Sequence, residues 1–334
     1  MRKATIKEVA AEAGVSTATV SRVLNESGFV SDEIKERIHR AVEKLNYRPN
    51  AVARSLKQDK SYTIGIVVPD ITNPFFSKLS RGIEDAVAGH GYQLIFCSTD
   101  EDAEKERRLG RMLSEKRVDA LVLASSDDRP DMAESLEKAG TPVILVDRRF
   151  EPPSNRLDLI AEDNRLGAYS LAKALLQKGH RRIGVINGSL TASTGRDRFD
   201  GYESAMREHG IQPDDRLVFE GRFTEEGGIE AVRYFMDLPD KPTAMLSFNN
   251  QMTFGVLLEL TRRGCRVPGD FAVASYGWVE AALLLNRPGL LYVEQAPYDM
   301  GKKAGERLLQ RLGGGKDSMQ EPLTEIFEPK ICEI

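Results

Sequence analysis

Five side chains between Thr17 and Asn25 are of the kinds that read DNA bases, and they share one face of a predicted helix. Arg22 carries a planar guanidinium that can donate two hydrogen bonds to guanine O6 and N7 in a major groove. Thr17 and Ala18 offer methyl groups to thymine, and hydroxyls such as that of Ser21 suit phosphate oxygens. The face has no acidic side chain. The pattern therefore favours a DNA-reading helix, and the alternative is a helical bundle without a DNA role.

Three short helices are predicted to position this face. The tetrapeptide Thr5–Glu8 reads as a capping box, in which the first hydroxyl and the last carboxylate satisfy free backbone N–H groups, so the first helix begins there. Gly14 suits the positive φ at the end of that helix. Ser16 is expected to cap a second helix over residues 17–24, and a third helix is expected over residues 31–45. The tight glycine-containing turn between the first two helices predicts a helix-turn-helix.

The first sixty residues are similar to one protein family over a long ungapped stretch. The matching segments are residues 5–10, 13–25 and 45–56. They resemble the DNA-binding head of the lactose-repressor (LacI) family, in which the segment matching residues 50–57 is a hinge helix that enters the minor groove in pairs. The resemblance implies that Leu56 is wedged into the central base step of the operator, which bends the duplex. Asn50, Ala53 and Arg54 would line the groove walls. The alternative is that this segment is only a linker.

Residues 1–60 are therefore expected to form the domain that binds operator DNA. The candidate DNA-binding residues are Thr5, Ser16, Thr17, Ala18, Thr19, Ser21, Arg22, Asn25, Tyr47, Asn50, Ala53, Arg54 and Leu56. Residues 1–60 carry 12 basic and 8 acidic side chains, whereas the rest of the chain carries 35 and 43, so only the head suits a polyanion. A homodimer would read a pseudo-palindromic operator, because its two identical reading helices require inverted half-sites.

From Tyr62 onward, short apolar runs alternate with stretches long enough for crossover helices. The predicted strands are residues 63–68, 93–97, 120–124, 143–146, 182–186, 244–247 and 271–275. This alternation is typical of a doubly wound parallel sheet, and its restart after Asn164 indicates two such lobes. Ligands of these sheets bind at the carboxyl ends of the strands, so two facing lobes make a binding cleft.

Motifs in residues 61–334 are similar to the effector-binding domains of the same family, which share their two-lobed α/β fold with periplasmic sugar-binding proteins. These motifs are Pro69–Phe76, Arg81–Glu84, Lys178–His180, Arg198 with Gly201 and Tyr202, and Gln295 with Tyr298–Gly301. The resemblance implies a first lobe of about 62–160 plus 293–320. It implies a second lobe of about 161–292 plus 321–334, joined to the first by three crossing strands.

The same resemblance implies a set of effector-binding residues. They are Phe75, Asp147, Arg198, Phe223, Asn249 and Gln295. Aromatic rings can stack on a sugar ring, while amides and carboxylates bind hydroxyls, so we expect a small carbohydrate-like effector. Binding of this effector would control the binding of operator DNA, with the protein acting most simply as a repressor.

Two positions depart from the family pattern and bear on the effector. Asn250 and Gly277 each stand where an Asp is common, so the expected site has lost two carboxylates. One hypothesis is an anionic sugar acid or sugar phosphate that pairs with Arg198. The other is an ordinary neutral sugar, which Asp147 would suit. Trp278, the sole tryptophan, either fills the vacated space or is structural.

Composition and motifs exclude several other classes. The chain is 41% hydrophobic and 29% charged, without an apolar run near the roughly 18 residues that span a bilayer, so a membrane protein is not expected. An export signal is not evident and the three cysteines are widely spaced, so we expect a cytoplasmic protein. An exported solute-binding protein would also lack the DNA-binding head.

Catalytic motifs are also missing from the sequence. We find no phosphate-binding loop, nucleophile elbow or metal-ligand spacing, so an enzyme, a cofactor and a metal site are not expected. The last residues lack the leucine heptads that would form a tetramer, which favours a homodimer.

Overall fold

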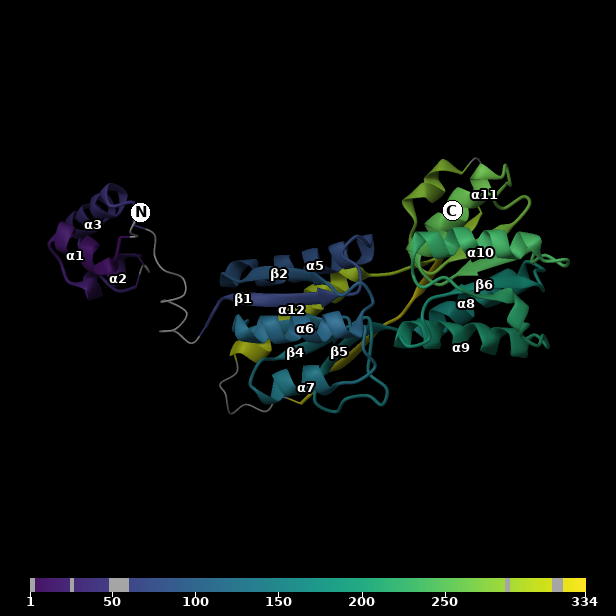
Figure 1. Ribbon diagram of the computed structural model, residues 1–334, viewed down its shortest axis with the longest axis horizontal. Coiled ribbons are helices and arrows are strands. Elements are labelled where there is room, and N and C mark those ends of the chain that lie inside the picture. Colours follow the sequence, from purple (N-terminus) through teal and green to yellow (C-terminus); the bar gives the residue numbers. More distant parts are fainter. Residues whose placement is uncertain (1–3, 25–26, 48–59, 286–288, 314–320) are drawn as a thin grey trace. The chain divides into compact units, whose positions relative to one another are not determined.

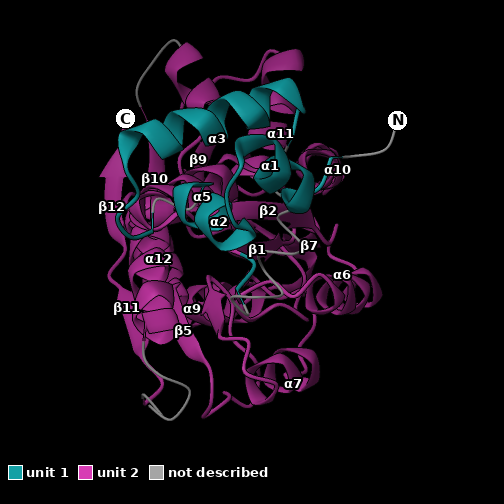
Figure 2. Ribbon diagram, turned by 90° about the vertical axis from the view of Figure 1, so that its left-hand side faces the viewer, with its two compact units in different colours: residues 1–61 teal, residues 62–334 magenta. Residues whose placement is uncertain are grey.

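The computed structural model describes residues 4–24, 27–47, 60–285, 289–313 and 321–334. They divide into two compact units, Met1–Ser61 and Tyr62–Ile334 (Figures 1 and 2). Each unit has its own hydrophobic core. None of the helices described is long and apolar enough to cross a membrane.

The first unit is a small helical domain, and it confirms the predicted helix-turn-helix. Its helices are α1 (Ile6–Ala13), α2 (Thr17–Leu24) and α3 (Asp32–Lys44). The expected capping box is present, because Thr5 N donates to Glu8 Oε2 at 2.7 Å and Glu8 N donates to Thr5 Oγ1 at 3.4 Å. Gly14 ends α1 with a φ of +65°. Among the described residues of this unit, Val9, Val20 and Ile38 are completely buried and form the centre of its apolar core.

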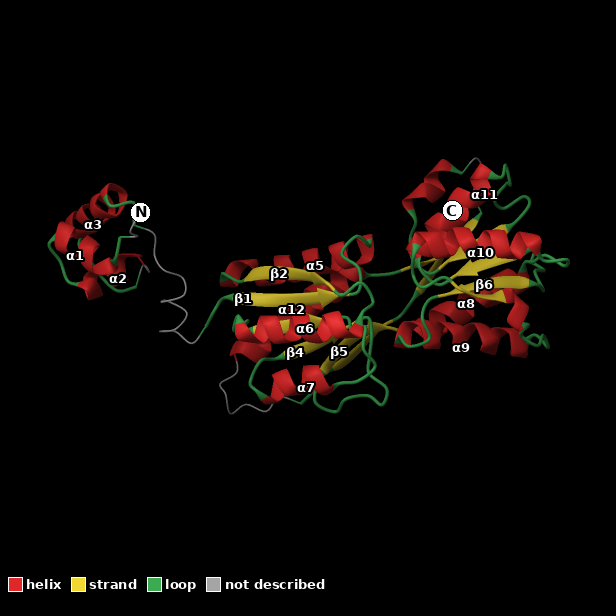
Figure 3. Ribbon diagram, viewed as in Figure 1, coloured by secondary structure: helices red, strands yellow, loops and turns green. Residues whose placement is uncertain are grey.

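The first lobe of the second unit is built on a six-stranded parallel sheet of order β11-β5-β4-β3-β1-β2. Its strands are β1 (Thr63–Val68), β2 (Gln93–Ser98), β3 (Ala120–Leu123), β4 (Val143–Val146), β5 (Asp158–Glu162) and β11 (Thr324–Phe327). Helices α5 (Pro74–Val87) and α12 (Pro297–Gly313) pack together on one face. Helices α6 (Ala103–Glu115) and α7 (Asp131–Lys138) cover the other face (Figure 3).

The second lobe repeats this architecture with a sheet of order β12-β10-β9-β8-β6-β7. Its strands are β6 (Ile183–Asn187), β7 (Val218–Glu220), β8 (Ala244–Ser247), β9 (Ala272–Ser275), β10 (Leu290–Glu294) and β12 (Lys330–Glu333), the last antiparallel to β10. Its helices are α8 (Asn164–Gln177), α9 (Ser193–Glu208), α10 (Glu225–Asp237) and α11 (Asn250–Arg262). Helix α8 packs against α9, and α10 packs against α11 (Figure 3). The predicted two-sheet α/β fold class is thereby confirmed.

One predicted boundary within the second unit was wrong. All of residues 321–334 were expected in the second lobe, but β11 pairs with β5 and extends the first sheet. The chain passes from one sheet to the other after β5, after β10 and again between β11 and β12. Strand β11 has only four residues, which alternate between exposed and half-buried side chains. The sequence of so short a strand does not indicate which of the two sheets it joins.

Candidate functional site

In the first unit, α2 presents a polar face outward while its apolar side chains enter the core. Thr17, Ala18 and Arg22 are exposed, whereas Val20 and Val23 are buried. The core therefore fixes the position of the helix, while its exposed face carries hydrogen-bonding and methyl groups. A helix that contacts base edges in a DNA major groove needs both properties.

The start of α2 is held by its own side chains. The Ser16 hydroxyl accepts a hydrogen bond from Thr19 N at 3.1 Å and lies 2.9 Å from Thr19 Oγ1. Arg37 of α3 donates to Ala13 O at 2.6 Å and so fixes the turn between α1 and α2. This turn sets the angle at which α2 is presented.

The other predicted DNA-binding residues fall into two groups. Thr5 is exposed within the capping box, Ser21 is half-buried, and Tyr47 packs against the core of the unit. The remaining candidates lie outside the described residues, as does the predicted hinge helix over residues 50–57; they are Asn25, Asn50, Ala53, Arg54 and Leu56.

In the second unit, a cavity lies between the two lobes, and we call it the inner cavity. The structure brings all six predicted effector-binding residues to its lining; they are Phe75, Asp147, Arg198, Phe223, Asn249 and Gln295. They come from loops and helix starts at the carboxyl ends of the strands, where ligands of α/β sheets bind. The inner cavity has a volume of only about 40 Å³, far below the roughly 300–1,000 Å³ of ligand pockets, so a ligand of ordinary size could enter it only if the lobes separated.

Arg198 is the most tightly held of these residues. Its Nε donates to Asn164 Oδ1 at 2.7 Å, and its Nη1 donates to the Phe248 carbonyl oxygen. Its guanidinium carbon lies 3.7 Å from the centre of the Tyr276 ring, in a cation–π contact. Because these partners fix the guanidinium, Arg198 has a single orientation at the cavity.

Asp147 faces Arg198 from the first lobe and has a φ of +63°. Burial raises the pKa of its carboxyl, and the positive charges of Arg198 and Arg148 partly oppose that shift. The carboxyl therefore lies in a low-dielectric site where its charge depends on nearby cations or hydrogen-bond donors.

Sequence reasoning missed Arg148, which follows Asp147 and also lines the inner cavity. Its Nη1 and Nη2 donate to the two Glu101 carboxylate oxygens at 2.7 and 2.6 Å. Its guanidinium carbon lies 5.1 Å from the centre of the Phe223 ring, which belongs to the other lobe. Its position could have indicated this role, because Arg148 is the second residue after β4, at the carboxyl end of the sheet where ligands bind.

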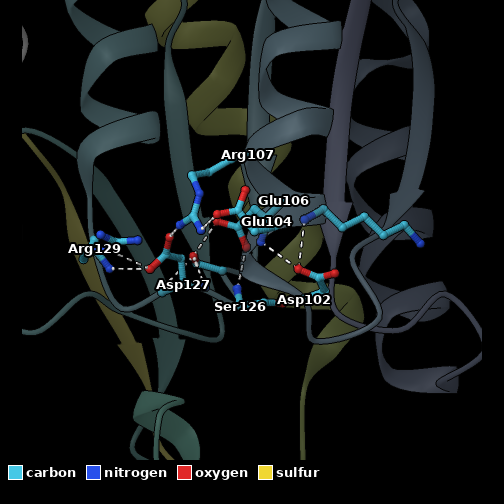
Figure 4. A network of polar contacts seen from close by, with 9 residues as sticks. Asp102, Glu104, Glu106, Arg107, Ser126, Asp127 and Arg129 are labelled. Carbon is cyan, nitrogen blue, oxygen red and sulfur yellow. Dashed lines mark hydrogen bonds and ion pairs between the residues drawn. The ribbon is translucent and has the colours of Figure 1, made fainter.

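A network of polar contacts joins α6 to the loop after β3, whose Ser125 carbonyl binds Arg148 (Figure 4). The buried Glu106 carboxylate accepts from Ser125 Oγ at 2.7 Å and from Ser126 N at 2.5 Å. Arg107 forms an ion pair with Asp127 on the same loop. Because the Ser125 carbonyl accepts from Arg148 at 3.2 Å, α6 positions Arg148 through this loop.

Glu162 was also missed, and it joins two of the segments that cross between the lobes. Tyr276 Oη donates to Glu162 Oε2 at 2.9 Å, and Gln295 Nε2 donates to the same oxygen at 3.3 Å. Burial raises the pKa of Glu162 to about 7, although these hydrogen bonds and the charge of Arg198 lower it. Glu162 ends β5, a strand that the sequence pattern did not reveal.

The two departures from the family pattern both lie at the cleft. Asn250, half-buried, pairs with Asn73 of the first lobe through two amide hydrogen bonds. Gly277 has a φ of +105° and lies against Gln295. Trp278 is half-buried, with its ring centre 5.0 Å from that of Tyr292, and it lines a separate cavity beside the cleft.

Comparison with known families covers both units. Residues 5–50 match the family described as "Bacterial regulatory proteins, lacI family". Residues 61–325 match "Periplasmic binding proteins and sugar binding domain of LacI family".

Comparison with individual proteins gives full-length matches. The chain is 38% identical over 331 residues to the HTH-type transcriptional repressor PurR of Vibrio atlanticus (strain LGP32), covering 99% of this chain and 97% of that protein. The structure is similar to that of the transcriptional regulator CelR in complex with cellobiose, with 29% sequence identity and a TM-score of 0.72. It is also similar to the lac repressor dimer bound to operator and the anti-inducer ONPF, with 25% sequence identity and a TM-score of 0.80. Each structural match covers 99% of this chain and 98% of the other.

Proposed function

The chain belongs to the LacI family of bacterial regulatory proteins, and from this premise we propose that it is a transcriptional repressor controlled by a small effector. It binds a pseudo-palindromic operator as a homodimer, with α2 of each protomer reading one half-site. The observation that carries the proposal is the exposed face of α2, which presents Thr17, Ala18 and Arg22. The Ser16 cap and the core of the unit hold this helix in place.

The effector that we propose is a carbohydrate-like molecule bound between the lobes. The inner cavity combines the Phe75 and Phe223 rings with the hydrogen-bonding groups of Asp147, Arg198 and Asn249, which is the chemistry of a site for a hydroxylated ring. Because residues of both lobes line the inner cavity, a bound effector would favour one separation of the lobes. This change in the second unit would in turn alter the affinity of the DNA-binding unit for its operator.

The charges at the cleft support a neutral effector over an anionic one. Arg148 is neutralised by Glu101 at 2.6 Å, and Arg198 faces the buried carboxyls of Asp147 and Glu162. Arg198 also donates to protein partners through Nε and Nη1. An anionic group would therefore meet carboxyls as well as a guanidinium already engaged.

This function places the protein in the cytoplasm, where operator DNA is accessible, and it does not include catalysis. The full-length relative is a repressor by name, which supports a regulatory role over an enzymatic one.

Selection of DNA by the purified full-length protein tests the proposal. We expect enrichment of one inverted-repeat site, retained in gel-shift assays at salt concentrations that abolish binding to random DNA, because non-specific contacts are the more salt-dependent ones. The proposed function would be contradicted if no sequence were enriched, or if the enriched site were a single half-site bound by a monomer.

A further inference from the structure

A second cavity, which we call the outer cavity, lies beside the interlobe cleft and has a volume of about 450 Å³. Helices α5 and α12 of the first lobe contribute Lys78 and Tyr298 to its lining, and the second lobe contributes Trp278 and Tyr292. Its size falls within the range of pockets that hold small organic ligands. The outer cavity is therefore large enough for a sugar ring, which the inner cavity in this arrangement of the lobes is not.

The two cavities share part of their walls. Phe75, Asn250 and Gln295 line both of them. Gly277 lies behind this shared wall, and a Cβ atom there would be 2.8 Å from Gln295 Oε1 and 3.6 Å from Asn250 Cβ. The missing side chain at position 277 thus leaves room for the Gln295 amide at the wall that the two cavities share.

An aromatic wall gives the outer cavity its apolar surface. The rings of Trp278 and Tyr292 lie with their centres 5.0 Å apart and their planes inclined by 60°, and both side chains are half-buried. A half-buried indole face can stack on the C–H face of a sugar ring while the ring hydroxyls remain at the polar rim. This arrangement assigns a stacking role to Trp278, which the family resemblance did not supply.

The polar lining of the outer cavity is balanced in charge. Lys330 Nζ donates to Glu294 Oε2 at 2.9 Å in an ion pair, and the Tyr298 hydroxyl donates to Asp85 Oδ2 at 3.1 Å. Lys78 and Asp299 add one positive and one negative side chain to the rim. The balance suits a neutral polyhydroxylated group better than an anion.

We propose that the outer cavity binds the second ring of a two-ring neutral carbohydrate, with that ring stacked on Trp278. The first ring of this carbohydrate lies at the inner cavity once the lobes have separated to admit it. This inference rests on the proposed function, since it specifies the size and class of the effector of that site. Each cavity is lined by residues of both lobes. A disaccharide would therefore contact both lobes at two cavities, whereas a monosaccharide would contact them at one.

Titration of the full-length protein with matched sugars tests this inference. The probes are glucose with cellobiose and maltose, and galactose with lactose and melibiose, followed by the fluorescence of Trp278, which is the sole tryptophan. We expect one disaccharide to bind about ten-fold more tightly than its component monosaccharide and to change the Trp278 emission, because only the second ring reaches the indole.

Three variants separate the stacking contact from a general loss of structure. Trp278→Leu is expected to weaken disaccharide binding about ten-fold in calorimetry, while Trp278→Phe keeps most of the affinity because it keeps an aromatic face. Gly277→Ala is expected to weaken disaccharide binding, because the added Cβ atom crowds Gln295 at the wall that the two cavities share. Thermal midpoints identify any variant that fails to fold.

Equal affinities for mono- and disaccharides, an unchanged Trp278 emission, or full affinity in Trp278→Leu would overturn the inference while the proposed function stands. Binding of none of these sugars would overturn it as well. Failure of the proposed function appears separately, as the failure of operator selection.

Discussion

Asn73 and Asn250 bind each other across the interlobe cleft through two reciprocal amide hydrogen bonds of 3.1 and 3.0 Å. Asn73 comes from the first lobe, where its Oδ1 also accepts from Phe75 N at 3.0 Å and caps α5. Asn250 begins α11 in the second lobe. One side chain thus serves both as a helix cap and as half of a contact that closes the lobes.

A double-mutant cycle of Asn73→Ala and Asn250→Ala measures this contact. We expect Asn73→Ala to lower the unfolding free energy more than Asn250→Ala, by about 1 kcal/mol, because only the former removes the cap of α5. The coupling energy between the two sites is expected to be about 1–2 kcal/mol. Urea unfolding followed by Trp278 fluorescence gives these values, and strictly additive effects would show that the pair does not couple the lobes.

The stability of the second unit is expected to depend on pH through Glu162. Its pKa is about 7 in the folded protein against an ordinary 4.5, so the folded state binds a proton more tightly than the unfolded state does. Its stabilising contribution is complete below pH 4.5 and is lost as pH rises through 7. Asp147, Arg198 and Tyr276 are the charged or titratable groups that act on it.

Glu162→Gln tests this dependence by removing the titration while keeping the shape. From pH 5 to pH 8 the variant is expected to gain stability relative to the wild type, by on the order of 3 kcal/mol at most. Denaturant unfolding at several pH values measures the difference, and the exposed Glu306→Gln serves as control. A constant difference between wild type and Glu162→Gln across this range would refute the assignment.

Arg22 is expected to read a guanine in each half-site. Arg22→Ala should weaken operator binding by on the order of 1–3 kcal/mol per half-site and relax the preference at one base pair, because a bidentate contact is lost. Arg40→Ala removes the same charge from α3, where Arg40 is exposed, and should leave the base preference unchanged. Repeating the DNA selection with each variant decides the point; an unchanged site for Arg22→Ala would make Arg22 a phosphate contact.

Gly14 is expected to tolerate no side chain at the turn before α2. Its φ is +65°, and a Cβ atom would lie 2.6 Å from Arg37 Nη2, which donates to Ala13 O. Gly14→Ala should therefore destabilise the first unit by about 1–2 kcal/mol for the backbone alone, and by more once Arg37 is displaced.

Gly28 provides a matched control for Gly14. Gly28 also has a positive φ, of +80°, but among the residues that the structure describes, its chain neighbours apart, the atom nearest to an added Cβ would be Arg22 Cδ, at 4.0 Å. Hydrogen exchange of the first unit within the full chain is expected to rise more in Gly14→Ala than in Gly28→Ala. Equal effects would mean that Arg37 adds nothing to the turn.

The charge of the effector can be tested by a thermal-shift screen of neutral sugars, sugar acids and sugar phosphates. We expect stabilisation by a neutral sugar, because Arg198 already donates to Asn164 and Phe248 and faces Asp147. Stabilisation that is confined to acids or phosphates and lost in Arg198→Ala would instead support an anionic effector.

Local patterns in the sequence determined the helix-turn-helix and the two α/β lobes. The capping box at Thr5, the left-handed Gly14 and the spacing of apolar residues in α2 act over a few residues, so their consequences are readable without the rest of the fold. The six effector-binding residues that the family resemblance implied, and that no local pattern singled out, also line one cavity, because strand ends of parallel sheets converge on the same edge.

Tertiary structure alone decided which side chains meet across the cleft. Asn73 and Asn250 are 177 residues apart in the sequence, and Glu162 and Gln295 are 133 apart. Such pairs depend on the separation and rotation of two lobes, which no local pattern encodes. The same holds for the raised pKa of Glu162, because burial by the surrounding segments, and not the neighbouring sequence, removes its carboxylate from water.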